Sequence, residues 1–381
     1  MGTGVTFIGS LTVDIIKMID RYPSAGMLSK IGEISSCVGG LAANTAISLK
    51  VLDPALDVRA MGMIGDDQNG EHILRTLDSY GIERSGVRAH PSLPTSFTDV
   101  MTDAASGTRT FFHQEGACAA YGYGDVAFDR VGTPHAHVGY ALLLKSMDAP
   151  DPEYGAVMAR ALHRLQSAGI TTSIDVVSES AKRYQKVVIP CLKYVDYIFL
   201  NEIEASEVTG IPLLPEAGGE PAGPAAAPAA ELAAGPAAEL AVGSAAGSAA
   251  DSGASSPALD AAMHGMCEAL LSHGVGKMAV IHSPRGGWAV SAADRARHFS
   301  PALRLPPGFI KGSVGAGDAF CAGMLQALLR GASGTEALET ANLAAAANLS
   351  HSNSISGMRP LSELLRDPVL RGARERAERR D

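Results

Sequence analysis

The residues that could do chemistry most directly lie in a glycine-rich segment near the end of the chain. This segment reads Gly-Ser-Val-Gly-Ala-Gly-Asp over residues 312–318, and an apolar helical pattern follows it. Glycine lets the backbone approach a ligand closely, and the free N–H groups at a helix N-terminus favour an anion such as phosphate. Asp318 could accept a proton from an attacking hydroxyl while the N–H groups of Gly315, Ala316 and Gly317 stabilise the transferred group. A carboxylate at this position could instead cap the helix, and the segment alone leaves both roles open.

Two other nucleotide-binding patterns do not fit the chain. The glycine spacing before Asp318 matches the start of a Walker A loop, but an acid stands where that motif requires lysine. No Gly-x-Gly-x-x-Gly follows the first predicted strand, which argues against a dinucleotide-dependent oxidoreductase on a doubly wound sheet. The chemistry indicated is phosphoryl transfer to a hydroxyl.

A second glycine pair lies near the start of the chain. Gly39 and Gly40 precede a helical pattern whose first turns contain Asn44, an amide that can both donate and accept hydrogen bonds. An asparagine here is also typical of a helix start. In the same chain as residues 312–318, and in this order, the pair indicates a ligand site.

The two segments resemble the signatures of the PfkB, or ribokinase-like, family of carbohydrate kinases. Those signatures are Gly-Gly-x-x-x-Asn near the N-terminus and Gly-Ala-Gly-Asp near the C-terminus, and the resemblance extends to residues 62–70 and 201–204 and covers about residues 5–357. It implies a cytoplasmic transferase that moves the γ-phosphate of ATP to a hydroxyl of a small carbohydrate, with Asp318 as general base. A nucleoside kinase of the same family and a catalytically weak, sugar-binding regulatory homologue remain as alternatives.

The resemblance also assigns the sugar side of the site. Asp14 matches a carboxylate, expected on the turn after the first strand, that accepts hydrogen bonds from sugar hydroxyls in similar kinases. Gly39, Gly40 and Asn44 would contact the same ring. Arg109 could reach an anionic or hydroxylated substrate, although a surface charge on a strand is the simpler interpretation.

The nucleotide side departs from the family pattern. Asn201 and Glu204 match residues that hold Mg²⁺ near the ATP phosphates, through water, and Asp175 at a strand end is a weaker candidate. Relatives have Thr-x-Gly-x-x-Gly where this chain has Ala-Val-Ile-His-Ser-Pro-Arg-Gly-Gly over residues 279–287, and an aspartate of a monovalent-cation site is replaced by Gly312. Potassium activation is therefore left open. The residues expected to contact ATP are Asn201, His282, Ser283, Gly287 and, beside the adenine, Asn342.

The elements that must position these residues alternate between strands and helices. Apolar runs predict strands at 5–10, 58–64, 137–146, 171–176, 195–201 and 277–282. Helical patterns fall at about 42–52, 69–80, 152–168, 181–192, 258–273, 318–330 and 335–349. This alternation predicts an α/β fold with three layers, a mostly parallel central sheet with helices on both faces, and ligands at the carboxyl ends of the strands.

Four segments interrupt the alternation. The segments 11–38 and 95–116 look extended, and in the family they would form a small β lid through which a homodimer can assemble. Residues 212–257 are dominated by Ala, Pro, Gly and Ser, which predicts a disordered surface insertion. Residues 371–381 read as a charged, solvated tail after a single kinase domain at 1–370.

Composition agrees with a large enzyme that acts on small molecules. The chain has 381 residues, a hydrophobic content of 46% and a formal net charge of −9, which offers no basic face for nucleic acid. Five widely spaced cysteines without a Cys-x-x-Cys pair indicate neither a disulfide framework nor a zinc site. No apolar run reaches membrane-spanning length. We therefore expect no nucleic-acid or membrane partner and a cytoplasmic location.

Overall fold

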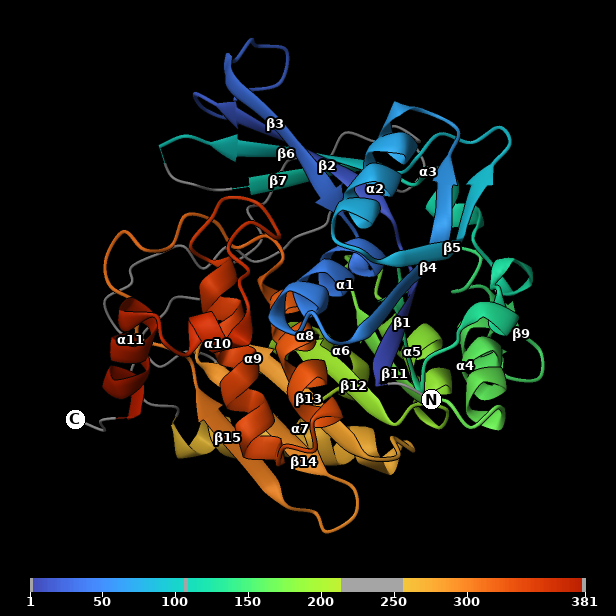
Figure 1. The fold of residues 1–381 in the computed structure, drawn as a ribbon, viewed down its shortest axis with the longest axis vertical. Helices are drawn as coiled ribbons and strands as arrows, with labels where there is room; N and C mark the ends of the chain where they lie inside the picture. The colour runs from blue at the N-terminus through green and yellow to red at the C-terminus, as the bar shows by residue number, and fades with distance from the viewer. Residues whose placement is uncertain (1–2, 106–108, 214–255, 379–381) are drawn as a thin grey trace.

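A nine-stranded sheet runs through the centre of the protein (Figure 1). The computed structural model describes residues 3–105, 109–213 and 256–378. Neighbouring strands are parallel except at one end of the sheet, where two pairs are antiparallel. In spatial order the strands are β15 (Arg297–Pro301), β14 (Gly286–Ser291), β13 (Met278–Ser283), β12 (Tyr197–Asn201), β11 (Thr171–Val176), β8 (His135–Ala141), β1 (Gly4–Gly9), β4 (Asp57–Gly65) and β5 (Glu83–His90).

Helices cover both faces of this sheet, which gives the three layers that the sequence predicts. Phe7 and Ile8 are adjacent in β1, and they pack into two separate hydrophobic clusters because successive side chains of a strand point to opposite faces. On the Phe7 side lie α1 (Leu41–Leu52), α2 (Gln68–Ser79), α8 (Ala316–Leu329) and α9 (Gly334–Asn348). On the Ile8 side lie α4 (Val157–Ser167), α5 (Tyr184–Leu192), α6 (Glu202–Thr209) and α7 (Pro257–Ser272).

The apolar strands agree with the sequence prediction, and the polar ones were missed. Strand β5 reads Glu-Arg-Ser-Gly-Val-Arg-Ala-His and lies at the sheet edge, where solvent accepts polar side chains, so it carries no continuous apolar run. The prediction of a strand at 137–146 is too long. Strand β8 ends at Ala141 because Leu142 has a φ of 78°, and its N–H donates to Asp148 Oδ1.

A second, four-stranded sheet lies above α1 in the view of Figure 1. Its order is β3 (Ile31–Gly39), β2 (Thr12–Ile19), β6 (Phe97–Asp103) and β7 (Arg109–Gln114), so the segments predicted to be extended do form strands. Asp14 lies within β2, paired with Cys37 and Thr98, and its expected place on a turn is wrong. The chain turns earlier than expected, at Ser10 and Leu11, and then enters β2 directly.

Short elements connect the larger ones. Before α4, the two-residue strands β9 (Pro150–Asp151) and β10 (Gly155–Ala156) pair, so this helix begins later than the predicted residue 152. Gly155 has a φ of 85°, which a helix does not accommodate. Between β7 and β8 lie α3 (Gly116–Ala120) and two turns of 3₁₀-helix, η1 (Tyr123–Asp125) and η2 (Phe128–Arg130).

Residues 368–378 are helical, which corrects the prediction of a solvated tail from residue 371 onward; residues 379–381 lie outside the described residues. After α10 (Leu361–Leu364), α11 (Pro368–Glu378) packs beside α9 (Figure 1). Leu370 and Ala373, three residues apart, are fully buried, and Arg374 forms an ion pair with Glu339 of α9 at 2.6 Å. Arg371 and Arg376 are exposed on this helix. Most of the predicted insertion, residues 214–255, lies outside the described residues.

None of the helices in the described ranges combines the length and the hydrophobicity that a membrane span requires.

The order of the strands in the large sheet places a topological switch point beside β1. From β1 the chain passes through α1 to β4 on one side, whereas β8 and β11 pair on the other side. The carboxyl ends of β1 and β8 therefore flank a topological switch point, where open α/β sheets bind ligands.

Candidate active site

Asp318 lies at the switch point, in the first turn of α8, and three side chains from distant segments donate hydrogen bonds to it. Asn44 Nδ2 donates to Oδ2 at 3.1 Å, and Thr45 Oγ1 donates to Oδ1 at 3.0 Å; both come from the first turn of α1. The Tyr140 hydroxyl, from the end of β8, donates to Oδ1 at 2.5 Å. Oδ1 thus has two donors and Oδ2 has one, which leaves Oδ2 able to accept a hydrogen bond from a substrate hydroxyl.

The site concentrates buried carboxyl groups. Burial raises the pKa of Asp318, although the hydrogen bonds from Tyr140, Asn44 and Thr45 lower it. Burial and the nearby charge of Asp318 raise the pKa of Asp14 to about 7. The same two causes raise the pKa of Asp175, at the end of β11, well above its usual range. Asp14 of β2 and Asp175 of β11 each interact electrostatically with Asp318 of α8, so the three acids titrate as a coupled group.

A loop after α9 fixes the orientation of the Asn44 amide. Ser354 Oγ donates to Asn44 Oδ1 at 3.0 Å, so the amide NH₂ is directed at Asp318. Gly315, which precedes α8, has a φ of 77°, and a Cβ atom there would lie 2.6 Å from the Cβ of Ser354. Only glycine combines this conformation with this contact. The glycine of the motif therefore lets the loop that carries Ser354 pack against the start of α8.

The glycine pair before α1 brings the backbone close to Asp14 and Ser10. A Cβ atom on Gly39 would lie 2.7 Å from Asp14 Oδ2, and one on Gly40, whose φ is 82°, would lie 2.5 Å from the carbonyl oxygen of Ser10. The Leu41 N–H donates to Ser10 Oγ at 3.1 Å. The absence of side chains at these two positions allows the backbone to pack this closely against Asp14 and Ser10.

Beneath Asp318 lies a buried cluster that the sequence did not indicate. Atoms of His137, Asp175 and Cys321 lie within 4.8 Å of one another, and Asp175 Oδ1 is 3.8 Å from His137 Nε2. Burial lowers the pKa of His137 to about 3, so this imidazole is neutral. Ser173 Oγ lies 2.7 Å from His137 Nδ1 and fixes the ring. The cluster supports the sheet edge on which the carboxyl groups stand.

Asn201 and Glu204 lie at the end of β12, where they form a capping box at the start of α6. Asn201 Oδ1 accepts from the Glu204 N–H at 2.8 Å, and the Asn201 N–H donates to Glu204 Oε2 at 2.9 Å. Ser178 Oγ donates to Glu204 Oε1. Burial raises the pKa of Glu204 to about 8, and Asp175 contributes to this shift, so the two acids are neighbours along the sheet edge. A cation would stabilise this row of buried acids. The oxygens of Asn201 and Glu204 already accept hydrogen bonds, so the pair fits a Mg²⁺ held through its water ligands better than a Mg²⁺ bound directly.

The residues expected on the nucleotide side divide into two groups. His282, Ser283 and Gly287 lie in the β13–β14 hairpin beside α8, where the His282 ring is 3.5 Å from the position of a Cβ atom on Gly317. Asn342 makes its contacts with another strand, β15. Its Nδ2 donates to the Ser300 carbonyl at 2.9 Å, and it also contacts Ser300 Oγ and the Pro301 carbonyl, so this amide holds β15 against α9.

Arg109 lies on β7 and reaches the other glycine of the motif. A Cβ atom on Gly312 would lie 2.7 Å from Arg109 Nη2.

The sequence did not indicate three residues of the site. Thr45 and Tyr140 bind the Asp318 carboxylate, and Ser354 binds the Asn44 amide. Tyr140 could have been considered, because it lies within a predicted strand of the central sheet; no sequence signal distinguishes Ser354 from other serines.

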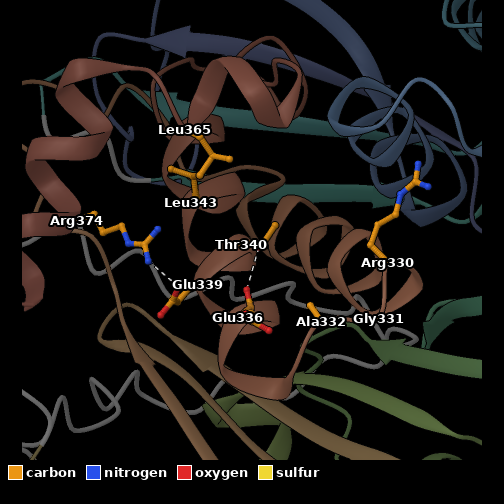
Figure 2. Close-up of a pocket in the computed structure, with 9 residues that line it drawn as sticks. All are labelled: Arg330, Gly331, Ala332, Glu336, Glu339, Thr340, Leu343, Leu365 and Arg374. Carbon is orange, nitrogen blue, oxygen red and sulfur yellow. Dashed lines mark hydrogen bonds and ion pairs between the residues drawn. The ribbon is translucent and has the colours of Figure 1, made fainter.

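A surface hollow of about 590 Å³ lies away from this site (Figure 2). It is lined by residues of α9 and α11 and by Arg330 at the end of α8, with the Arg374–Glu339 ion pair on its wall. Arg330 follows Asp318 by twelve residues, so it lies about 18 Å away along the helix. The hollow is therefore separate from the carboxyl cluster.

Comparisons with known proteins agree with this geometry. The pfkB family carbohydrate kinase profile matches residues 3–234 and 220–360. An ATP-dependent ribose-1-phosphate kinase of Halopiger xanaduensis is 28% identical over 168 residues, which cover 44% of this chain and about half, 52%, of that relative.

Solved structures share the fold across nearly the whole chain. Arabidopsis thaliana ribokinase, complexed with ribose and ATP, superposes with a TM-score of 0.68 at 20% identity, covering 96% of this chain and 98% of that one. A Burkholderia thailandensis nucleoside kinase in complex with inosine gives a TM-score of 0.65 at 18% identity, covering 95% and 94%. The fold is thus ribokinase-like, and together with the family match across both signature segments this leads to one assignment: the chain belongs to the PfkB family of carbohydrate kinases.

Proposed function

We propose that this protein transfers the γ-phosphate of ATP to a hydroxyl group of a small carbohydrate. The observation that carries the proposal is the position of Asp318. Its carboxylate stands in the first turn of α8, next to the N–H groups of Gly315, Ala316 and Gly317, and is oriented by Asn44 and Thr45. A base and an anion-stabilising helix end therefore meet at one point, which is what attack of a hydroxyl on a phosphoryl group requires.

In the proposed reaction the proton of the acceptor hydroxyl moves to Asp318 Oδ2. The acceptor oxygen forms a bond to the γ-phosphorus, the bond from that phosphorus to the β,γ-bridging oxygen breaks, and ADP leaves. The N–H groups at the start of α8 stabilise the negative charge on the transferred group. Asp14 and Asn44 hold the other hydroxyls of the sugar, beside the backbone of Gly39 and Gly40.

The nucleotide is proposed to lie along α8 and the β13–β14 hairpin, with contacts from His282, Ser283 and Gly287. Mg²⁺, when bound, would neutralise phosphate charge. Asn201 and Glu204 would hold its water ligands, because their own oxygens are engaged in the capping box. Asn342 is proposed to lie beside the adenine while its amide nitrogen binds β15.

The small sheet is proposed to act as a lid that excludes water from the transfer. Its outer side exposes Ile34 at 62% and Phe112 at 57%, which would suit contact with the lid of a second copy in a homodimer. All five cysteines are free and buried, in keeping with a reducing, cytoplasmic location. Size-exclusion chromatography with light scattering measures the dimer directly, and a monomer at micromolar concentration would contradict that part.

The proposal is tested by ADP release from purified protein with ATP, Mg²⁺ and a panel of sugars, sugar phosphates and nucleosides. We expect release that depends on one carbohydrate and a phosphorylated product identified by mass spectrometry. Release with nucleosides only would assign a nucleoside kinase instead. Ligand-induced thermal stabilisation without any turnover would indicate a regulatory homologue.

A further inference from the structure

Arg109 is a partly buried cation without an ion-pair partner in the part of the chain that the structure describes. It lies on the small sheet, on the strand face that also carries Phe111 and His113, and its Nη1 is buried without a hydrogen-bond partner among the residues that the structure describes. Burial lowers its pKa, and the thiol of Cys37 is the titratable group that acts in the opposite direction. No carboxylate in the described ranges forms an ion pair with this guanidinium.

Two other partly buried arginines of this protein form ion pairs. Arg59 binds Asp57 at 2.8 Å, and Arg183 binds Glu179 at 2.6 Å. Removing a guanidinium from water is unfavourable unless a carboxylate or a phosphate takes the place of the solvent. Arg109 is therefore arranged for an anion that the described part of the protein does not supply.

The neighbours of Arg109 define where this anion would lie. Nη2 lies 2.7 Å from the position of a Cβ atom on Gly312, so any side chain at residue 312 would displace the guanidinium. The other neighbour, Cys37, pairs with Asp14 across β2 and β3, and Asp14 also acts on the pKa of Cys37. The guanidinium thus occupies the space between the sugar-side acid of the small sheet and the start of the glycine-rich loop.

This placement favours the acceptor over ATP as the source of the anion. The N–H groups proposed to hold the transferred phosphoryl group belong to Gly315, Ala316 and Gly317, whereas Arg109 lies beside Gly312 and interacts electrostatically with Cys37. Cys37 and Asp14 are on the acceptor side of the base. A guanidinium binds phosphate or carboxylate through two parallel hydrogen bonds, and it distinguishes an anionic substrate from a neutral one.

We propose that Arg109 and the Gly312 backbone form an anion subsite for the acceptor, so that the substrate is a sugar that already carries a phosphate or a carboxylate. This inference rests on the proposed kinase function and narrows its substrate class. The space that glycine leaves at residue 312 admits the guanidinium. The acceptor bridges Arg109 and Asp318, with its anionic group on the first and its reacting hydroxyl on the second.

The test compares matched acceptors in the wild-type protein, in Arg109→Met and in Arg21→Met, a control that changes an exposed arginine in the loop after β2. The acceptor pairs are ribose 1-phosphate with ribose, fructose 6-phosphate with fructose, and gluconate with glucose, so the phosphate and carboxylate arms are separate. We expect kcat/KM for one anionic acceptor to exceed that of its neutral counterpart by about tenfold or more, the effect of one charge-assisted contact. Arg109→Met should remove this preference and leave the KM for ATP within about threefold of wild type.

Several outcomes would overturn the subsite. Equal use of anionic and neutral acceptors by the wild type would do so, as would equal losses on both in Arg109→Met. A raised KM for ATP in that variant would assign the guanidinium to the γ-phosphate instead. A purely structural role predicts a lower Tm for Arg109→Met without ligand, whereas an unpaired cation predicts an unchanged or higher Tm.

If no acceptor is phosphorylated, the kinase proposal fails and the subsite is judged by binding alone. Inorganic phosphate is then the probe, measured by thermal shift. Stabilisation of the wild type and of Arg21→Met, but not of Arg109→Met, would support the subsite. Equal stabilisation of all three proteins, or of none, would overturn it.

Discussion

Asn44 Nδ2 lies 3.1 Å from Asp318 Oδ2, although 274 residues separate the two in the chain. One residue is in the first turn of α1 and the other in the first turn of α8, so the N-terminal ends of two helices converge on one carboxylate. The positive ends of both helix dipoles face this point, which favours negative charge there. This relationship connects the two signature segments physically and leads to the following predictions.

Replacement of Asp318 by Asn should reduce kcat by about 10²-fold or more while the protein stays folded and binds ATP, because the amide cannot accept the proton of the acceptor. Steady-state kinetics and nucleotide titration measure the two effects. Asp78→Asn, at an exposed carboxylate paired with Arg84, is the control and should behave as wild type. Near-normal turnover in Asp318→Asn would rule out its role as base.

Thr45→Val should move the acid limb of the kcat/KM profile to higher pH. The Thr45 hydroxyl donates to Asp318 Oδ1 at 3.0 Å and thereby stabilises the ionised carboxylate, so its loss raises the pKa of Asp318 further. We expect a loss of about three- to tenfold at pH 6 that shrinks as the pH rises. Thr76→Val removes a hydroxyl that bonds only within α2, at 2.8 Å from the His72 carbonyl, and should leave the profile in place.

The unliganded protein should become less stable as the pH rises from about 6.5 to about 8. Burial raises the pKa of Asp14 and Asp148 to about 7 and of Glu204 to about 8, so in this window the folded protein holds protons that the unfolded chain releases. Buried His135 and His137, with pKa values of about 3, add stability with rising pH only up to their usual value of 6.5.

Urea denaturation at fixed temperature and several pH values measures this slope. Asp148→Asn should flatten it without changing the site at Asp318, because Asp148 lies beyond the strand end and bonds to the Leu142 N–H. A free energy of unfolding that rises between pH 6.5 and 8 would show that these carboxyl groups are ionised in the folded protein.

Leu370→Ala should lower the free energy of unfolding by about 2–4 kcal/mol, because the Leu370 side chain is fully buried under α11. Leu365→Ala, at a side chain that is 52% exposed, serves as the control and should change stability little. An equal, small effect of both changes would mean that α11 does not pack against α9.

The amino-acid sequence determined the features that depend on local chemistry. Apolar runs between helical patterns identify most strands of the central sheet, and the glycines before Asn44 and Asp318 mark the helix starts at the ligand-binding edge. These features are readable because backbone conformation and side-chain periodicity act over a few residues. The sequence did not predict the polar edge strand β5 or the docked helix α11, because solvent and the face of a distant helix decide how far their side chains are buried.

Only the tertiary structure decided which side chains meet. Tyr140, Thr45 and Ser354 complete the surroundings of Asp318 and Asn44 from separate segments, and nothing in their local sequence requires this. In the folded protein Asn201 and Glu204 bind each other in a capping box, and Arg109 lies partly buried beside Gly312. Hydrogen bonds and desolvation act between groups that chain folding brings together, so pKa values and unpaired charges emerge with the packed fold and not with the motif.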